Sequence, residues 1–290
     1  MPESLREIPF AIDDNAGDRI DGDVRFVDTG ALQPVVVFVH GFKGFKDWGP
    51  FPAWGRALAR SGFVAVHLNV SHNGVSAEAP TAFTELDRFA RNTYTRELND
   101  VRAVVDAVAD HDLPDAPIDT SRIGLMGHSR GGGTAILQAA RDDRVRALVT
   151  WSAVSTFIGR FTDEQIRDWE TTGTTDVVNS RTGQTMPLDR VVYDDAMAHA
   201  DELDIEAAAA QIDVPWLIVH AEDDEAVDID AAETLAAAND RATLLRATGG
   251  HTFGGAHPHD GTVPDSLQQV WDATIAFFDR AHATSYDSGA

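Results

Sequence analysis

The chain has 290 residues, and its 47 acidic against 23 basic side chains give a formal net charge of −24. This charge makes nucleic acid and anionic membrane surfaces poor partners, so we expect neither. The absence of cysteine excludes disulfides, thiolate metal ligands and a cysteine nucleophile. Residues 1–7 lack the apolar core of a secretory signal, and no apolar run is long enough to cross a bilayer. We therefore expect a cytoplasmic protein.

Two antiparallel edge strands open the predicted fold, at 8–12 and 19–27, with a polar turn at 13–17 between them. Strands and helices then alternate along the chain. Further strands are predicted at 35–39, 63–68, 122–126, 145–151, 216–220 and 242–246. Helices are predicted at 50–60, 95–110, 134–140, 229–239 and 264–281. Because this alternation is typical of a mostly parallel sheet covered on both faces, we predict one α/β domain over residues 1–290 with about eight strands.

Two segments interrupt the alternation. Residues 71–93 are predicted to be a long polar connection. In residues 153–213 the sequence favours a helix at 162–170, an irregular stretch at 171–190 and a helical stretch that ends near residue 210. Long segments of this kind inside compact domains are usually functional. We interpret 153–213 as a small insertion that lies over the site.

The most informative stretch is Gly127-His128-Ser129-Arg130-Gly131, which lies between an apolar strand and a helix. In this setting Gly-x-Ser-x-Gly is typical of a nucleophile elbow. The glycines remove Cβ atoms that would collide in a sharp turn, and the following helix directs its free N–H groups at the serine. A phosphate-binding loop would need a lysine before the serine, and none is present. Ser129 is therefore the candidate nucleophile.

A serine nucleophile needs a base, and the base needs an orienting acid. In open parallel sheets the reacting groups gather at the carboxyl ends of the strands. An acidic cluster with Asp223, Asp224 and Asp228 follows one of the last two predicted strands, and His251 follows the other. The chain order is thus Ser, Asp, His. Each of the three aspartates is a candidate for the acid at this point.

Four motifs resemble those of the α/β-hydrolase superfamily, and together they cover nearly the whole chain. They are His40-Gly41-Phe42, Gly127-His128-Ser129-Arg130-Gly131, His220-Ala221-x-x-Asp224-x-x-Val227 and Gly250-His251. Within that superfamily the chain is similar to the dienelactone-hydrolase-like and prolyl-oligopeptidase-domain-like branch of serine hydrolases. It departs from the usual pattern at Ala221, where the family generally has glycine. Dienelactone hydrolases proper use a cysteine, so lactone cleavage is not implied.

The resemblance implies an α/β-hydrolase fold and a role for each matching residue. Ser129 would be the nucleophile, His251 the general base and acid, and Asp224 the acid that holds the imidazolium. The backbone N–H groups of Phe42 and Arg130 would form the oxyanion hole, which usually makes the largest electrostatic contribution to acyl transfer. The implied function is a serine hydrolase without cofactor or metal that cleaves an ester or a small acyl substrate.

Two other functions remain open. The same triad could serve a small-peptide or aminoacyl hydrolase, but peptidases of that branch generally carry a further domain that screens substrates. A protein of a different class could use the same fold as a non-catalytic ligand-binding pocket. The complete triad and both flanking glycines favour the enzyme. The sequence does not set the oligomeric state.

Three residues are candidates for the substrate pocket. The only two lysines, Lys43 and Lys46, lie close to the expected oxyanion donor, in a stretch that continues to Trp48. Lys43 is a candidate because its ammonium group could attract a substrate carboxylate. Trp48 is a candidate because it lies in the same stretch. The alternative is that Lys46 pairs with Asp47 and that Lys43 is solvated. His72 is the third candidate, since it follows the carboxyl end of a predicted strand.

The other histidines are interpreted as structural. His40 and His220 end buried strands, and the side chain of His128 should point away from Ser129. The run His257-Pro258-His259-Asp260 has the composition of a metal cluster, but no matching ligands are recognisable elsewhere. We expect it to be a polar turn.

The acidic composition predicts that the protein needs salt. A net charge of −24 in one domain opposes compaction, and molar salt shortens the screening length to about 3 Å. The melting temperature should therefore rise steeply when KCl is raised from low to molar concentration, as measured by circular dichroism. A flat response would leave the base composition of the genome as the explanation of the acidity.

Overall fold

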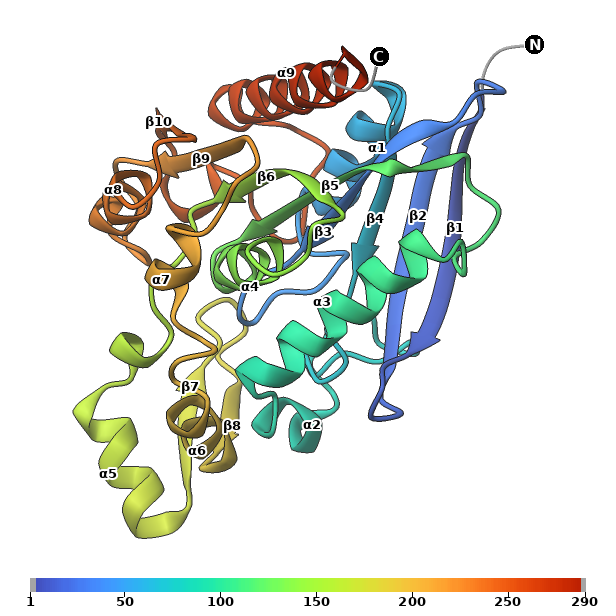
Figure 1. The fold of residues 1–290 in the computed structure, drawn as a ribbon. Helices are drawn as coiled ribbons and strands as arrows, with labels where there is room; N and C mark the ends of the chain where they lie inside the picture. Colours follow the sequence, from blue (N-terminus) through green and yellow to red (C-terminus); the bar gives the residue numbers. More distant parts are fainter. Residues whose placement is uncertain (1–3, 288–290) are drawn as a thin grey trace.

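The structure of the protein, a computed structural model, describes residues 4–287 (Figure 1). Residues 1–3, which belong to the segment examined for a secretory signal, and residues 288–290 lie outside it. Eight strands form one sheet in the order β1-β2-β4-β3-β5-β6-β9-β10. Their bounds are Leu5–Asp13 (β1), Arg19–Val27 (β2), Gln33–Val39 (β3), Val64–Leu68 (β4), Ile118–His128 (β5), Val145–Trp151 (β6), Trp216–Ala221 (β9) and Ala242–Ala247 (β10).

The pairings of β1 with β2 and of β2 with β4 are antiparallel, and the other five pairings in this sheet are parallel. The predicted mostly parallel sheet with two antiparallel edge strands is therefore confirmed. The strand β3 is apolar at consecutive positions, so its sequence does not alternate between apolar and polar residues. Val35, Val37 and Val39 belong to one core, whereas Val36 and Phe38 belong to the other. Both faces of this strand are buried, as expected for a parallel sheet.

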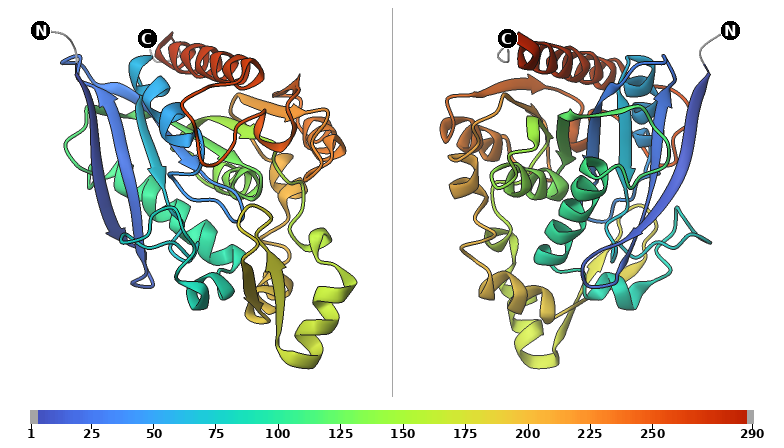
Figure 2. Two further views of the ribbon diagram at one scale, coloured as in Figure 1. Left: turned by 180° about the vertical axis from the view of Figure 1, so that it is seen from behind. Right: turned by 45° about the vertical axis from the view of Figure 1, so that its right-hand side comes forward.

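Helices cover both faces of the sheet (Figures 1 and 2). The core on one face includes α1 (Phe51–Arg60) and α9 (Asp265–Asp287). The core on the other face includes α3 (Tyr94–Ala109), α4 (Arg130–Ala139), α7 (Ile205–Ala209) and α8 (Ile229–Ala237). The connection 71–93 contains a short helix, α2 (Leu86–Ala90), that the sequence did not predict. Within residues 4–287, every helix is too short or too polar to span a bilayer.

The stretch 171–190 is not irregular, so that prediction is wrong. It contains an antiparallel hairpin of two strands, β7 (Thr174–Val178) and β8 (Thr185–Asp189), which form a second small sheet. The strands have five residues each, half of these ten residues are polar, and only Thr175, Met186 and Leu188 are buried. Their period-2 pattern is therefore weak, because a strand shows it clearly only when one whole face meets a core.

An aromatic cluster joins the hairpin to the body of the protein. It includes Phe45, Phe83, Phe89, Trp169, Met186 and Leu188. Trp169 belongs to α5 (Asp163–Thr172), which follows the short 3-10 helix η1 (Ile158–Arg160), and α6 (Val191–Ala198) follows the hairpin. Figure 2 shows α5, the hairpin and α6, drawn from yellow-green to gold, at the end of the molecule opposite α9. The inserted elements thus pack on the loop that contains Phe45 and on α2 with its preceding loop.

A buried histidine on α9 provides a test of the core. His282 is 3 % exposed, and its ring stacks on Phe278. Among the residues that the structure describes, neither of its ring nitrogens has a hydrogen-bond partner. Burial lowers the pKa of His282 to about 4. As pH falls below about 6.5, this imidazole is protonated in the unfolded chain but stays neutral in the folded protein. The free energy of unfolding therefore decreases between about pH 6.5 and about pH 4, by up to about 1.4 kcal/mol per pH unit.

His282→Phe should remove this acid sensitivity and raise the melting temperature, because position 282 then no longer buries two ring nitrogens without a hydrogen-bond partner. The gain should be larger at pH 5 than at pH 8 in differential scanning calorimetry. His199→Gln, which removes an exposed histidine (44 % exposed side chain), serves as the control. An equal change at both pH values would contradict the interpretation.

Candidate active site

Ser129 lies in the turn between β5 and α4, with φ of 57° and ψ of −120°. Two glycines make this turn sterically feasible. A Cβ on Gly127 would lie 2.1 Å from the carbonyl oxygen of Gly131, and a Cβ on Gly131 would lie 2.3 Å from that of His40. Positive φ is rare for a residue with a side chain, and strain of this kind gathers at functional sites. The geometry therefore has the strained strand–turn–helix form of a nucleophile elbow.

His251 and Asp224 form a hydrogen-bonded pair near Ser129. The Nδ1–H of His251 donates to Asp224, with distances of 2.8 Å to Oδ2 and 3.1 Å to Oδ1. This leaves Nε2 as the ring nitrogen that can act as a base. His251 and Ser129 line the same two cavities. In the described part of the chain, no hydrogen bond joins the Ser129 hydroxyl to the imidazole, and such bonds are often long before substrate binds.

The carboxylate of Asp224 is fully buried and strongly held. Its Oδ1 accepts hydrogen bonds from the backbone N–H groups of Ala226 (2.8 Å) and Val227 (3.0 Å). Burial by itself raises the pKa of Asp224, but the hydrogen bonds from His251, Val227 and Ala226 outweigh it and hold this pKa well below its usual range. Asp224 is therefore ionised at neutral pH and favours protonation of His251 at Nδ1.

The other two candidate acids have different partners. Asp223 is exposed, and its Oδ1 accepts the backbone N–H groups of Gly249 (3.0 Å) and Gly250 (3.1 Å). It therefore holds the loop that carries His251 without touching the imidazole. Asp228 caps α8, where its side chain accepts from Asp230 N–H. Of the three aspartates, only Asp224 contacts His251 among residues 4–287.

The two candidate oxyanion donors lie on either side of Ser129. A Cβ on Gly41 would lie 2.9 Å from the Cβ of Ser129, so the loop that carries Phe42 passes directly beside the serine. Arg130 is the first residue of α4, where backbone N–H groups have no partner within the helix. Phe42, Arg130 and Ser129 all line one cavity. The two candidate donors thus lie in the wall of the cavity that Ser129 also lines.

Three buried histidines support the site, and one of them, His128, also lines the smaller cavity beside Ser129. His40 is hydrogen-bonded to the backbone at Gly41 (2.9 Å), and burial lowers its pKa to about 4. His128 donates from Nε2 to the carbonyl oxygen of His251 (2.9 Å), and burial lowers its pKa to about 3. His220 donates from Nε2 to the Val227 carbonyl (2.8 Å), and burial lowers its pKa too. Each is thus neutral at pH 7 and fixes a loop of the site.

Two cavities flank Ser129, one of about 130 Å³ and one of about 410 Å³. Lys43 lines both of them, and Trp48 lines the smaller one. His72 lines neither cavity, so this pocket prediction is wrong. Its Nε2 is instead hydrogen-bonded to Asp18 at 3.1 Å, in the turn between β1 and β2. Lys46 is paired with Asp23 and Asp47, each at 2.6 Å, as the alternative interpretation expected for Asp47.

Several residues that line these cavities escaped the sequence analysis. Asn179, Ser180 and Arg181 come from the turn of the β7–β8 hairpin, and Phe157 and Phe161 flank η1. Nothing in their local sequence indicates a site. They reach Ser129 only because the aromatic cluster packs the hairpin against the loop that contains Phe42 and Phe45.

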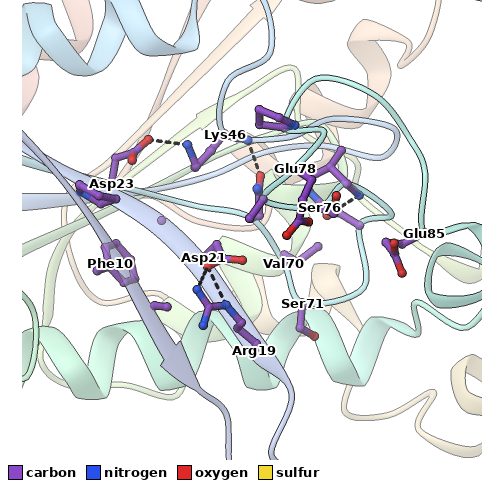
Figure 3. A pocket seen from close by; sticks show the side chains of 18 of the residues that line it. Phe10, Arg19, Asp21, Asp23, Lys46, Val70, Ser71, Ser76, Glu78 and Glu85 are labelled. Carbon is purple, nitrogen blue, oxygen red and sulfur yellow. Dashed lines mark hydrogen bonds and ion pairs between the residues drawn. The ribbon is translucent and has the colours of Figure 1, made fainter.

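A larger cavity, of about 760 Å³, lies apart from Ser129 between β1, β2 and the connection 69–88 (Figure 3). Its lining includes side chains of both charges, among them the pairs Arg19–Asp21 and Lys46–Asp23.

In the run His257-Pro258-His259-Asp260, Nδ1 of His257 accepts a hydrogen bond from Gly49 N–H at 2.9 Å. The part of the chain that the structure describes holds no cluster of three or more side chains suited to a metal ion.

Sequence comparison links the chain to bacterial proteins. It is 32% identical over 131 residues to the uncharacterized protein YcjY of Escherichia coli, which covers 45% of this chain and 38% of that one. It is 28% identical over 128 residues to the Bacillus subtilis protein named "Putative esterase YitV", which covers 44% of this chain and 48% of that one. The matched segment thus spans less than half the length of either relative.

Structural comparison shows the same fold in Est1E from Butyrivibrio proteoclasticus. The TM-score is 0.67 at 20% sequence identity, and the match covers 95% of this chain and 99% of Est1E. At this identity the likeness concerns the fold. The family model of the prolyl oligopeptidase family, Peptidase_S9, matches residues 56–279, which is more than half of the chain. The chain therefore belongs to the prolyl oligopeptidase family of α/β-hydrolase-fold hydrolases.

Proposed function

We propose that this protein is a serine esterase that cleaves an ester or a small acyl substrate through an acyl-enzyme on Ser129. The observation that carries this proposal is the hydrogen-bonded pair of His251 and Asp224 beside a serine held at φ of 57°. A family relative is named as an esterase, although its match to this chain is partial. A cofactor has no role in the reaction proposed here.

In the proposed reaction, Ser129 Oγ attacks the ester carbonyl carbon while Nε2 of His251 takes the hydroxyl proton. The carbonyl oxygen becomes negative and accepts hydrogen bonds from the backbone N–H groups of Phe42 and Arg130. The C–O bond then breaks, and His251 protonates the departing alcohol. A water molecule attacks the acyl-enzyme with His251 again as base, which releases the acid and restores Ser129.

The inserted elements in residues 153–213 serve as a cap in this proposal. Both cavities beside Ser129 are lined by residues of this segment, including Ser180 and Phe157. The cap would select the acyl group by its shape and would limit access of bulk water. A peptidase acting on long chains is disfavoured because the cavities are small, at about 130 and 410 Å³.

A fluorophosphonate probe tests the nucleophile, since an activated serine attacks phosphorus as it attacks a carbonyl. Wild-type protein should be labelled, Ser129→Ala should not, and labelling of His251→Ala should fall sharply. Ser155→Ala, which removes a serine outside both cavities, should keep full labelling. Intact folded wild-type protein that stays unlabelled would favour a non-catalytic ligand-binding protein.

Two aspartate variants test the acid. Asp224→Asn should lower kcat on a 4-nitrophenyl ester by about a thousandfold or more, because the wrong imidazole tautomer is then favoured. Asp223→Asn should lower it less than about tenfold, since an amide oxygen can still accept from Gly249 and Gly250. Equal losses, or a larger loss at Asp223, would show that Asp224 is not the orienting acid.

A further inference from the structure

Acidic side chains are abundant in the chain but absent from the lining of the cavities beside Ser129. The chain carries 47 acids and 23 bases. Within residues 4–287, no acid lines either cavity, whereas four bases do: Lys43, Arg130, Arg160 and Arg181. A pocket lined by one sign of charge recognises a ligand of the opposite sign. The reversal of charge in the lining of these two cavities therefore indicates an anionic ligand.

The cavity of about 760 Å³ in Figure 3 has a different distribution of charged side chains. There the bases are neutralised within the lining, since Arg19 lies 2.8 Å from Asp21 and Lys46 lies 2.6 Å from Asp23. Glu78 and Glu85 add further negative charge to that lining. A further cavity, of about 590 Å³, is lined by Glu164, Asp168 and Asp176. The absence of acids around Ser129 is thus not shared by these two larger cavities.

Of the four bases beside Ser129, only Arg130 is ion-paired with an acid among the described residues, while Arg160 donates to the backbone carbonyl of Ala226 (2.9 Å) in the larger of the two cavities. Arg130 is neutralised by the buried Glu97 at 3.2 Å, and its guanidinium stacks over the ring of Phe42. For Lys43 and Arg181, by contrast, the described part of the chain contains no carboxylate within ion-pair distance. Their charges remain available to a ligand.

Lys43 and Arg181 lie side by side in the smaller cavity. The guanidinium of Arg181 donates to the backbone carbonyl of Lys43 (3.1 Å), and the Lys43 ammonium donates to the carbonyl of Val178 (3.1 Å). Burial lowers the pKa of Lys43, and the nearby charges of Arg181 and Arg130 lower it further. Two like charges held together without an acid repel each other, and a bound anion would offset that repulsion.

We propose that Lys43 and Arg181 form a subsite for an anionic group on the substrate, so that the esterase acts on esters that carry a carboxylate or a phosphate. This inference rests on the proposed function of Ser129. The two bases and Ser129 line the same cavity of about 130 Å³, so the anionic group lies only a few bonds from the ester carbonyl. Arg181 offers a planar pair of donors and Lys43 a compact charge, which together suit either oxyanion.

The position of Arg181 also gives the hairpin a function. Its side chain lies over the ring of Trp48, with the guanidinium carbon 5.4 Å from the ring centroid. This contact holds the turn of the hairpin, residues 179–184, against the loop that carries Lys43. One half of the subsite thus comes from the inserted segment and the other from the loop beside the oxyanion donor Phe42.

The test compares two 4-nitrophenyl esters with the same chain length, the neutral pentanoate and the mono-glutarate, at one KCl concentration that keeps every variant folded. Spontaneous hydrolysis is subtracted. Wild-type kcat/KM should be about tenfold or more higher for the glutarate, a ratio that corresponds to about 1.4 kcal/mol. Lys43→Met and Arg181→Met should each remove most of this preference, because KM for the glutarate should rise much more than KM for the pentanoate.

Two further variants separate the subsite from general charge effects. Lys43→Arg should keep the preference for the glutarate, because it keeps the charge. Arg167→Met removes a positive charge from an exposed position on α5 outside both cavities and should also keep it. Equal kcat/KM values for the two esters in wild-type protein, or equal losses on both esters in Lys43→Met and Arg181→Met, would overturn the subsite while the esterase proposal stands.

Binding to Ser129→Ala tests the subsite independently of turnover. Titration calorimetry with glutarate and with inorganic phosphate should detect binding of at least one, and adding Lys43→Met should weaken it about tenfold. The anion that binds more tightly identifies the source of the charge. If neither anion binds, the subsite is wrong; if both esters resist hydrolysis but an anion binds at Lys43, the esterase proposal fails and the subsite stands.

Discussion

The close approach of three backbone segments beneath Ser129 constrains the rest of the site. The end of β3, the end of β5 and the start of α4 meet there, and a Cβ at Gly127 or Gly131 would overlap a carbonyl oxygen. Because these segments belong to the centre of the sheet, the surrounding core holds the strained serine in place. The same approach brings the loop with Phe42 beside Ser129, so one packing arrangement positions the proposed nucleophile and the proposed oxyanion donors.

A second constraint is the burial of the acid at the carboxyl end of β9. A lone carboxylate inside a protein is costly, and its ionised form persists only when hydrogen bonds replace water. Asp224 has such bonds from two backbone N–H groups and from His251. Its neighbour Asp223 has the opposite environment, exposed and bonded to the loop before His251. One aspartate therefore orients the imidazole, and the other holds the loop that presents it.

The inserted segment and the charge distribution are coupled. The β7–β8 hairpin is too small and too polar to fold on its own core, so it depends on the aromatic cluster around Phe45 and Trp169. That cluster places Arg181 next to Lys43, at cavities whose lining, among the described residues, contains bases and no acids. Stability of the insertion and charge of the pocket thus have the same structural origin.

The sequence by itself determined the order of strands and helices, the mostly parallel sheet, Ser129 in its elbow and His251 after the last strand, because these depend on local periodicity and on fixed glycine spacing. It did not determine the hairpin within 171–190 or the place of His72. The sequence could list Asp223, Asp224 and Asp228 and favour one by resemblance, but only the tertiary structure decided which carboxylate meets the imidazole. The physical reason is that side-chain contacts between distant loops depend on packing, and their residues carry no periodic signal in the chain.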